Sequence, residues 1–183
     1  MPKGLNRAVF LDRDGTLIKD AHYLKDPKKI EIIDGVGEAL MLIAKAGFKV
    51  FLHTNQSGVA RGYYGMKDVN ACNARMLELL QLPCDFFDGA CIAPEHPDQE
   101  GGYRKPSARF QLETIVKFDL SPDACWMIGD KWIDAQAGLG SGMRAALVET
   151  GKPIGEETKS QALASKVPIH CNLLDFTKRT LKL

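Results

Sequence analysis

Two aspartates separated by one residue follow the first apolar run of the chain. Residues 8–11 form a short apolar run typical of a buried strand, and Asp12 and Asp14 come directly after it, followed by Gly15. Aspartates are common in turns, and a calcium loop is another interpretation, although an EF-hand loop has its glycine at the sixth position rather than the fourth. A carboxylate at a strand end can also attack phosphorus or hold a divalent cation. The spacing of Asp12 and Asp14 therefore favours a catalytic or cation-binding role over a plain turn.

Two further residues, Thr54 with its hydroxyl and Lys105 with its ammonium, lie later in the chain and could bind an anion. Thr54 follows the apolar run of residues 48–53, in a turn that also contains Gly58. Such a turn is either a polar cap or a cradle of hydroxyl and backbone N–H groups for an anion. Lys105 precedes Pro106 and a helical pattern, so it is either solvated surface charge or a cation held near a helix N-terminus, where anions are favoured.

A second pair of aspartates follows a later apolar run. Asp130 and Asp134 come after residues 124–128 and are four residues apart, so both can face the same way at a helix start. An Asp N-cap with an acidic first turn would give the same pattern. Together with the first pair, the hydroxyl and the lysine, these aspartates make up the groups needed for phosphoryl transfer: a nucleophile, an acid/base, metal ligands and cations.

The elements that would position these groups alternate along the chain. Apolar runs predict strands at residues 8–11, 48–53, 89–93, 124–128, 144–148 and near 169. Helical spacing predicts helices over residues 36–44, 69–80 and 112–116, from 131, and from 173. This order predicts an α/β, Rossmann-like fold in a single domain over residues 1–183, with a mostly parallel sheet and helices on both faces. The carboxyl ends of parallel strands share one edge, where ligands bind.

Charge and hydropathy exclude several classes of protein. The chain has 24 Lys and Arg against 23 Asp and Glu, a net charge of +1, which gives no overall field for binding nucleic acid or an anionic membrane. The longest apolar run, residues 39–44, is far too short to span a bilayer, and the start of the chain lacks the apolar core of a signal peptide. We therefore expect a cytoplasmic protein that is a monomer and binds neither nucleic acid nor membrane.

As an ordered set, the four groups resemble the motifs of the haloacid dehalogenase (HAD) superfamily. The match spans residues 8–148 and is highly specific, and it consists of Asp12-x-Asp14-Gly15-Thr16, Thr54-Asn55, Lys105 and Gly129-Asp130-x-x-x-Asp134. The resemblance implies that Asp12 attacks phosphorus, and that Asp14 protonates the leaving group and later activates water. It also implies that Thr54 and Lys105 bind the phosphoryl oxygens.

The resemblance further implies one Mg²⁺. Its ligands would be Asp12, the backbone carbonyl of Asp14, and Asp130, while Asp134 would orient either a metal-bound water or Lys105. The segment between residues 17 and 33 is too short for a large cap domain, so the site should be open and covered only by loops.

Longer strings narrow the resemblance to one branch of the superfamily. Residues 10–16, 33–36, 54–62 and 104–106 resemble the branch that holds D-glycero-D-manno-heptose-1,7-bisphosphate 7-phosphatase and histidinol-phosphate phosphatase. The resemblance implies a small sugar-phosphate substrate, with a heptose bisphosphate favoured and histidinol phosphate or another phosphomonoester as the alternative. The residues expected to contact substrate are Asp20, Tyr23, Asn55, Gln56, Ser57, Arg104 and Lys131.

The chain departs from that branch at one loop. Many members carry a zinc loop of three Cys and one His before the Arg-Lys-Pro motif, but residues 93–103 here contain His96 and no Cys. Cys91 and His96 would supply at most half of a structural site, which needs four ligands. We therefore expect Mg²⁺ and no zinc.

A receiver-type signalling domain is the alternative from another class. It would also use a parallel α/β sheet, an acidic cluster with Mg²⁺, a hydroxyl and a lysine. It has no need of a second carboxylate two residues after the phospho-acceptor, because no alkoxide leaving group has to be protonated. Asp14 therefore favours the enzyme.

Overall fold

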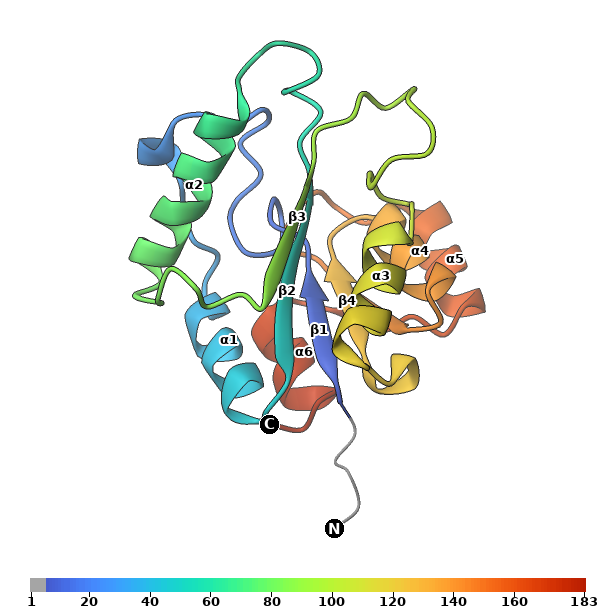
Figure 1. Cartoon of the computed structure of the whole chain (residues 1–183). Helices are drawn as coiled ribbons and strands as arrows, with labels where there is room; N and C mark the ends of the chain where they lie inside the picture. Colours follow the sequence, from blue (N-terminus) through green and yellow to red (C-terminus); the bar gives the residue numbers. More distant parts are fainter. Residues whose placement is uncertain (1–5) are drawn as a thin grey trace.

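A single parallel sheet organises the part of the chain that the computed structural model describes, residues 6–183 (Figure 1). Its six strands lie in the order β3-β2-β1-β4-β5-β6, and every pairing between neighbours is parallel. The strands are β1 (Ala8–Leu11), β2 (Lys49–Asn55), β3 (Gly89–Ala93), β4 (Trp126–Gly129), β5 (Arg144–Val148) and β6 (Ile169–His170). The predicted α/β fold with a mostly parallel sheet is confirmed.

Helices cover both faces of the sheet, as predicted. Figure 1 shows helices on either side of the sheet, with α1 (Val36–Lys45) and α2 (Met66–Leu79) on one side and α3 (Arg109–Phe118), α4 (Trp132–Gly140) and α5 (Glu156–Ala164) on the other. Helix α6 (Leu173–Arg179) packs in the same apolar layer as α1. The connections between parallel strands must cross over the sheet, so helices on both faces follow from the strand order.

Alternation along the central strand explains the two apolar layers. In β1, Val9 and Leu11 pack into the layer under α1, α2 and α6, while Ala8 and Phe10 pack into the layer under α3. All four side chains are fully buried. A strand covered on both faces has no solvent side, which is why residues 8–11 are continuously apolar rather than alternating.

The segment after β1 contains no cap domain. Residues 17–33 hold a 3₁₀ turn at Pro27–Lys29 and an isolated antiparallel bridge between Ile18 and Ile32. The expectation of a site without a large cap is therefore confirmed.

The predicted elements differ from the structure in some of their bounds and in one helix that was missed. The strand expected at residues 124–128 begins at Trp126, because Pro122–Ala124 forms a 3₁₀ turn ahead of it. Helix α5 was not predicted, since its sequence has no apolar stripe and Ala162 is its buried residue.

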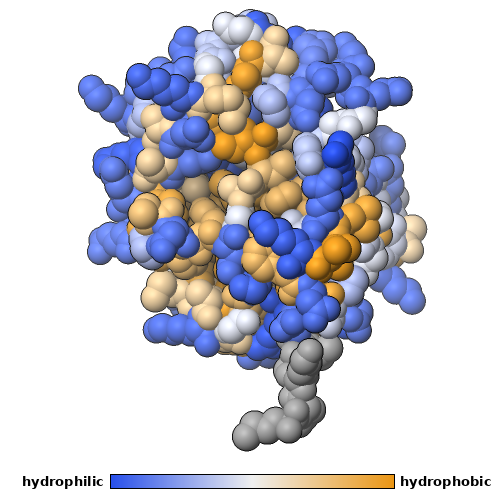
Figure 2. Space-filling model, viewed as in Figure 1, coloured by the Kyte–Doolittle hydropathy of each residue, from blue (hydrophilic) through white to orange (hydrophobic). Residues whose placement is uncertain are grey.

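Strand β3 lies at one edge of the sheet and faces the viewer in Figure 1. The same view in Figure 2 shows apolar residues along the middle of the face, flanked by polar residues. Among residues 6–183, no helix is long and apolar enough to cross a membrane.

Candidate active site

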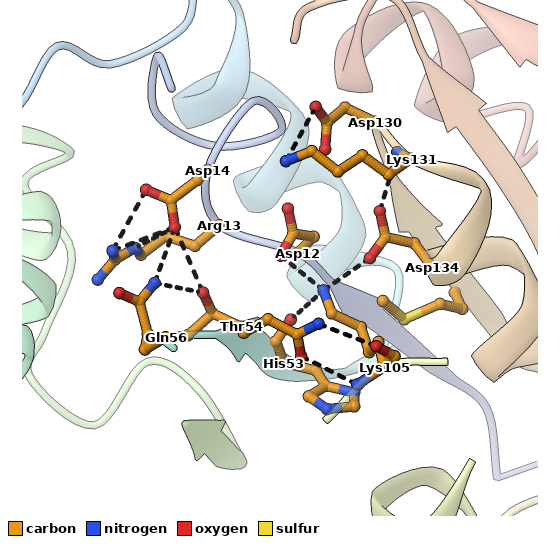
Figure 3. Close-up of polar contacts among 12 residues, drawn as sticks. Asp12, Arg13, Asp14, His53, Thr54, Gln56, Lys105, Asp130, Lys131 and Asp134 are labelled. Carbon is orange, nitrogen blue, oxygen red and sulfur yellow. Dashed lines mark hydrogen bonds and ion pairs between the residues drawn. The ribbon is translucent and has the colours of Figure 1, made fainter. Parts of the chain in front are cut away.

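The four predicted groups meet beyond the carboxyl edge of the sheet (Figure 3). Asp12 follows β1, and its backbone N–H donates to the Ile128 carbonyl of the neighbouring β4 at 3.0 Å. Thr54 lies at the end of β2, and Asp130 directly follows β4. Lys105 reaches the same place from the loop before α3. Strand ends therefore position three of the four groups, and a loop positions the fourth.

Lys105 is the buried centre of the arrangement. Its Nζ lies 2.6 Å from Asp12 Oδ1, 2.7 Å from Asp134 Oδ1 and 2.7 Å from the His53 carbonyl oxygen. Burial alone would lower the pKa of Lys105, but the two carboxylates raise it above its ordinary value. Burial also raises the pKa of Asp12, and Lys105 opposes that shift. The two carboxylates thus favour the charged form of the lysine although it is out of contact with water.

Three buried carboxylates offer a set of hard oxygen ligands. One oxygen from each of Asp12, Asp130 and Asp134 lies within 4.8 Å of the others. Both oxygens of Asp130 are buried without a hydrogen-bond partner. Burial, followed by the charge of Asp12, raises the pKa of Asp130 to about 7. A buried carboxylate without a donor is unfavourable unless a cation balances it, so the residues present fit a bound Mg²⁺.

Asp14 is turned away from this cluster. Its carboxylate accepts hydrogen bonds from Gln56 Nε2 at 2.9 Å, Arg13 Nε at 3.1 Å and Thr54 Oγ1 at 3.3 Å. Tyr64 donates to Gln56 Oε1 at 2.8 Å, which fixes the Gln56 amide with its nitrogen toward Asp14. The two aspartates of the first motif therefore face different surroundings. The carboxylate of Asp14 lies outside the three-carboxylate cluster, whereas the prediction for this residue concerned its backbone carbonyl.

An open cavity of about 250 Å³ lies against Asp14. All seven residues that were expected to contact substrate line it: Asp20, Tyr23, Asn55, Gln56, Ser57, Arg104 and Lys131. Asn55 also has a structural task, because its side-chain amide donates to the Lys105 carbonyl at 3.0 Å and accepts from the Lys105 N–H at 2.9 Å. The position of the seven residues on the cavity wall supports the predicted substrate contacts, which remain predictions.

Sequence reasoning missed other residues of the cavity and its surroundings. His22, Leu24, Tyr64, Ile133 and Lys152 also line the cavity. Lys152 comes shortly after β5, and Thr150 donates to the Gly15 carbonyl at 2.7 Å. The rule that ligands bind beyond strand carboxyl ends would have pointed to residues 150–152 had it been applied to the fifth strand.

Known proteins are similar to this chain in sequence and in fold. Residues 102–173 match the family model described as HAD-hydrolase-like. The D-glycero-beta-D-manno-heptose-1,7-bisphosphate 7-phosphatase of Pasteurella multocida (strain Pm70) is 37% identical over 165 residues, covering 86% of this chain and 90% of that protein. The D-glycero-D-manno-heptose-1,7-bisphosphate 7-phosphatase of Chlorobaculum tepidum (strain ATCC 49652 / DSM 12025 / NBRC 103806 / TLS) is 35% identical, covering 79% of each chain.

A solved structure agrees with these relatives. The D,D-heptose 1,7-bisphosphate phosphatase from B. bronchiseptica, complexed with magnesium and phosphate, superposes with a TM-score of 0.81. It is 25% identical, and the match covers 96% of this chain and 98% of that one. The chain therefore belongs to the HAD-like hydrolases. Within them, the relatives that carry the assignment are the heptose-bisphosphate 7-phosphatases. Membership of a hydrolase family confirms the enzyme and excludes the receiver-type interpretation.

Gly151→Ala should weaken magnesium binding. A Cβ at residue 151 would collide with the carboxylate of Asp130 and push it out of the cluster. Since a ligand stabilises the state that binds it, Mg²⁺ should raise the melting temperature of the wild type and raise that of the variant much less. Gly155→Ala is the matched control, because a Cβ there meets nothing within 4 Å. An equal magnesium-dependent shift in all three proteins would contradict the assignment of Asp130 as a ligand.

Proposed function

We propose that this chain hydrolyses the 7-phosphate of D-glycero-D-manno-heptose 1,7-bisphosphate, with Asp12 as the nucleophile. The observation that carries the proposal is the place of the Asp12 carboxylate beyond the edge of the parallel sheet, beside the buried ammonium of Lys105 and close to the Asp130 carboxylate, which accepts no hydrogen bond. The phosphatase relatives, which match over most of their length, support the substrate.

The residues of the site divide the chemistry between them. Asp12 attacks phosphorus and becomes an aspartyl-phosphate, while Thr54 and Lys105 bind the phosphoryl oxygens. Asp14 gives a proton to the departing sugar alkoxide and later takes one from the water that hydrolyses the intermediate. Asp14 lines the cavity, whereas the three aspartates of the cluster do not, so Asp14 is the one placed to meet a leaving group in the cavity.

Magnesium would be held by Asp12, Asp130 and the backbone carbonyl of Asp14, with Asp134 close by. When bound, the cation supplies positive charge that offsets the repulsion between the Asp12 carboxylate and the phosphate. Asp134 already has a second task, because its Oδ1 accepts from Lys105 and its Oδ2 accepts from the Lys131 backbone N–H at 3.0 Å. These contacts support orientation of Lys105, one of the two roles that the sequence left open for Asp134.

The absence of zinc stays a prediction, and the chemistry of the loop supports it. Zinc binds cysteine as the thiolate. Burial raises the pKa of the Cys91 thiol to about 12, with a further contribution from Glu95. His96 Nδ1 lies 3.2 Å from the Asp98 carboxylate. Among residues 6–183, the group of three His, Cys or carboxylate side chains close enough to hold a metal is the carboxylate cluster, and it includes neither Cys91 nor His96.

Asp12→Asn should abolish turnover, because an amide oxygen is too weak a nucleophile to attack phosphorus. The fold should survive, since Asp134 and the His53 carbonyl still bind the Lys105 ammonium. Phosphate release measures the loss, and circular dichroism with thermal melting checks the fold. Appreciable activity in a folded variant would remove Asp12 from the nucleophile's role.

Asp14→Asn should lower kcat by about 10²–10⁴-fold on a sugar phosphate if Asp14 is the general acid and base. The loss should be smaller on p-nitrophenyl phosphate, whose leaving group needs little protonation. Comparing kcat on the two substrates separates a loss of proton transfer from a structural effect of the substitution. An equal loss on both would mean that Asp14 only supports the local hydrogen bonds with Arg13 and Gln56.

Arg104→Ala should impair turnover of a substrate with two phosphates more than turnover of a substrate with one. Lys105 is committed to the phosphoryl site, whereas Arg104 lines the cavity and can bind a second phosphate through two parallel N–H groups. The value of kcat/KM for the heptose bisphosphate should fall by about a hundred-fold, in line with loss of a charge-assisted contact, and that for p-nitrophenyl phosphate much less. Arg75→Ala, which removes an exposed arginine of α2 paired with Glu78, is the matched control.

The same assay tests the substrate. Wild-type protein is compared on both anomers of the heptose bisphosphate, on histidinol phosphate and on simple esters. Histidinol carries an ammonium where the bisphosphate carries its second anion, so Arg104 should disfavour it. A wild type that prefers histidinol phosphate would overturn the heptose assignment and leave the HAD phosphatase chemistry standing.

A further inference from the structure

A fully buried histidine lies directly behind the candidate active site. His53 is on β2, next to Thr54, and its side chain has no contact with solvent. Its ring Nε2 is 2.9 Å from the Tyr103 carbonyl oxygen, and its Nδ1 is 2.9 Å from Nε2 of Gln111, which is also fully buried. The surroundings are otherwise apolar, with Phe110 packed edge-on at 5.1 Å and Met127 beside Gln111.

The partners of the ring determine its protonation. A carbonyl oxygen only accepts, so Nε2 of His53 must carry a proton and donate it to Tyr103. Burial, followed by the charge of Lys105, lowers the pKa of His53 to about 3, so the ring is neutral. Its Nδ1 is therefore an acceptor, and Gln111 must present its amide nitrogen to it. One tautomer of His53 and one orientation of Gln111 satisfy both contacts.

The buried polar pair of His53 and Gln111 stabilises the core poorly. The chosen orientation of Gln111 leaves its Oε1 buried without a partner. A buried unpaired carbonyl is destabilising, whereas two apolar side chains of similar shape would fill the same space at little or no loss of stability. The pair is therefore better explained by the loop that His53 holds in place than by a contribution of the pair to the free energy of unfolding.

What the histidine holds is the loop that carries the two cations. The Tyr103 N–H donates to Glu95 Oε1 at 2.8 Å, and the Tyr103 carbonyl accepts from His53. Two residues further on, Asn55 binds both backbone groups of Lys105, and the Lys105 ammonium returns to the His53 carbonyl. Residues 94–108 lie outside the helices and strands, so side chains fix this loop in place of a regular backbone ladder.

We infer that His53 and Gln111 are positioning residues, which fix residues 103–105 so that Arg104 faces the cavity and Lys105 reaches Asp12. The inference rests on the proposed function. Losing the donor to Tyr103 should displace Arg104 more than Lys105, because Asn55, Asp12 and Asp134 still hold Lys105. The defect should therefore fall on binding of the second phosphate more than on the chemical step.

The decisive variant replaces both partners at once. His53→Phe with Gln111→Leu keeps an aromatic ring packed against Phe110 and removes the unpaired Gln111 Oε1, while the Tyr103 carbonyl loses its donor, so the double variant should unfold near the wild-type temperature. Its kcat/KM on the heptose bisphosphate should fall about ten- to a hundred-fold, mostly through KM, because small displacements of a positioning group have effects of this size. Turnover of p-nitrophenyl phosphate should change by much less.

Two further variants complete the experiment. His53→Gln keeps an amide donor close to the place of Nε2 and should recover much of the lost kcat/KM. Thr114→Val changes another buried polar residue one turn along α3 and is the matched control, with wild-type kinetics expected. Should the double variant fail to fold, the Gln111→Leu protein, which removes the hydrogen bond that orients the His53 ring from its Nδ1 side, is measured in its place.

The outcomes separate this inference from the proposed function. A folded double variant with wild-type KM and kcat on both substrates would overturn the positioning role. If the wild type hydrolyses p-nitrophenyl phosphate but not the bisphosphate, the proposed substrate is wrong. In that case, the KM of the double variant for whichever phosphate ester the wild type prefers still tests the loop, and an unchanged KM refutes the inference.

Discussion

The ion pairing of Lys105 with Asp12 and Asp134 is the interaction on which the rest of the site depends. A buried ammonium is tolerated only where carboxylates and a carbonyl replace its hydration, and here all three contacts are within 2.7 Å. Asp130 then adds a third carboxylate, whose nearest cation is Lys131 Nζ at 3.6 Å. The protein's own charges therefore leave the cluster short of positive charge. That deficit is what fits it to a divalent cation and, through the cation, to a phosphate.

The fold explains how so many like charges can be brought together. Asp12 and Asp130 follow neighbouring parallel strands, and their backbones are fixed by the sheet before their side chains interact. Glycine makes the remaining space: Gly15, at a φ of +88°, and Gly151 both lie where any Cβ would collide with the Asp130 carboxylate. The stability of two apolar layers, with Phe10 and Leu11 buried on opposite faces, thus supports a destabilising cluster of charges at one edge.

The parts of this site that the sequence could predict are those that strand ends position. Asp12, Thr54 and Asp130 follow apolar runs, so the topology of a parallel sheet places them without knowledge of any contact. His53 and Gln111 could not be found in that way. The histidine falls within an apolar run, and its partner lies 58 residues away on a helix. Helix α5 was missed for a related reason: it packs through little more than Ala162, and its sequence carries no periodic apolar signal.

Without a cap domain, selectivity has to come from loops, and loops select only if their backbones are held. Residues 103–105 are held by hydrogen bonds that His53 and Asn55 donate to their carbonyls and by one that the Tyr103 N–H donates to Glu95. The loop on the other side of the cavity uses packing. His22 and Tyr23 both adopt left-handed backbone angles, with φ of 44° and 55°. Their rings contact each other at a tilt, and the Tyr23 ring packs edge-on against Tyr63. Such angles are unfavourable for side chains of this size and persist only where the surroundings enforce them. Both walls of the open cavity are therefore pre-organised. A substrate that reaches across it, with an anion at each end, gains from both walls at once, whereas a short monoester contacts one.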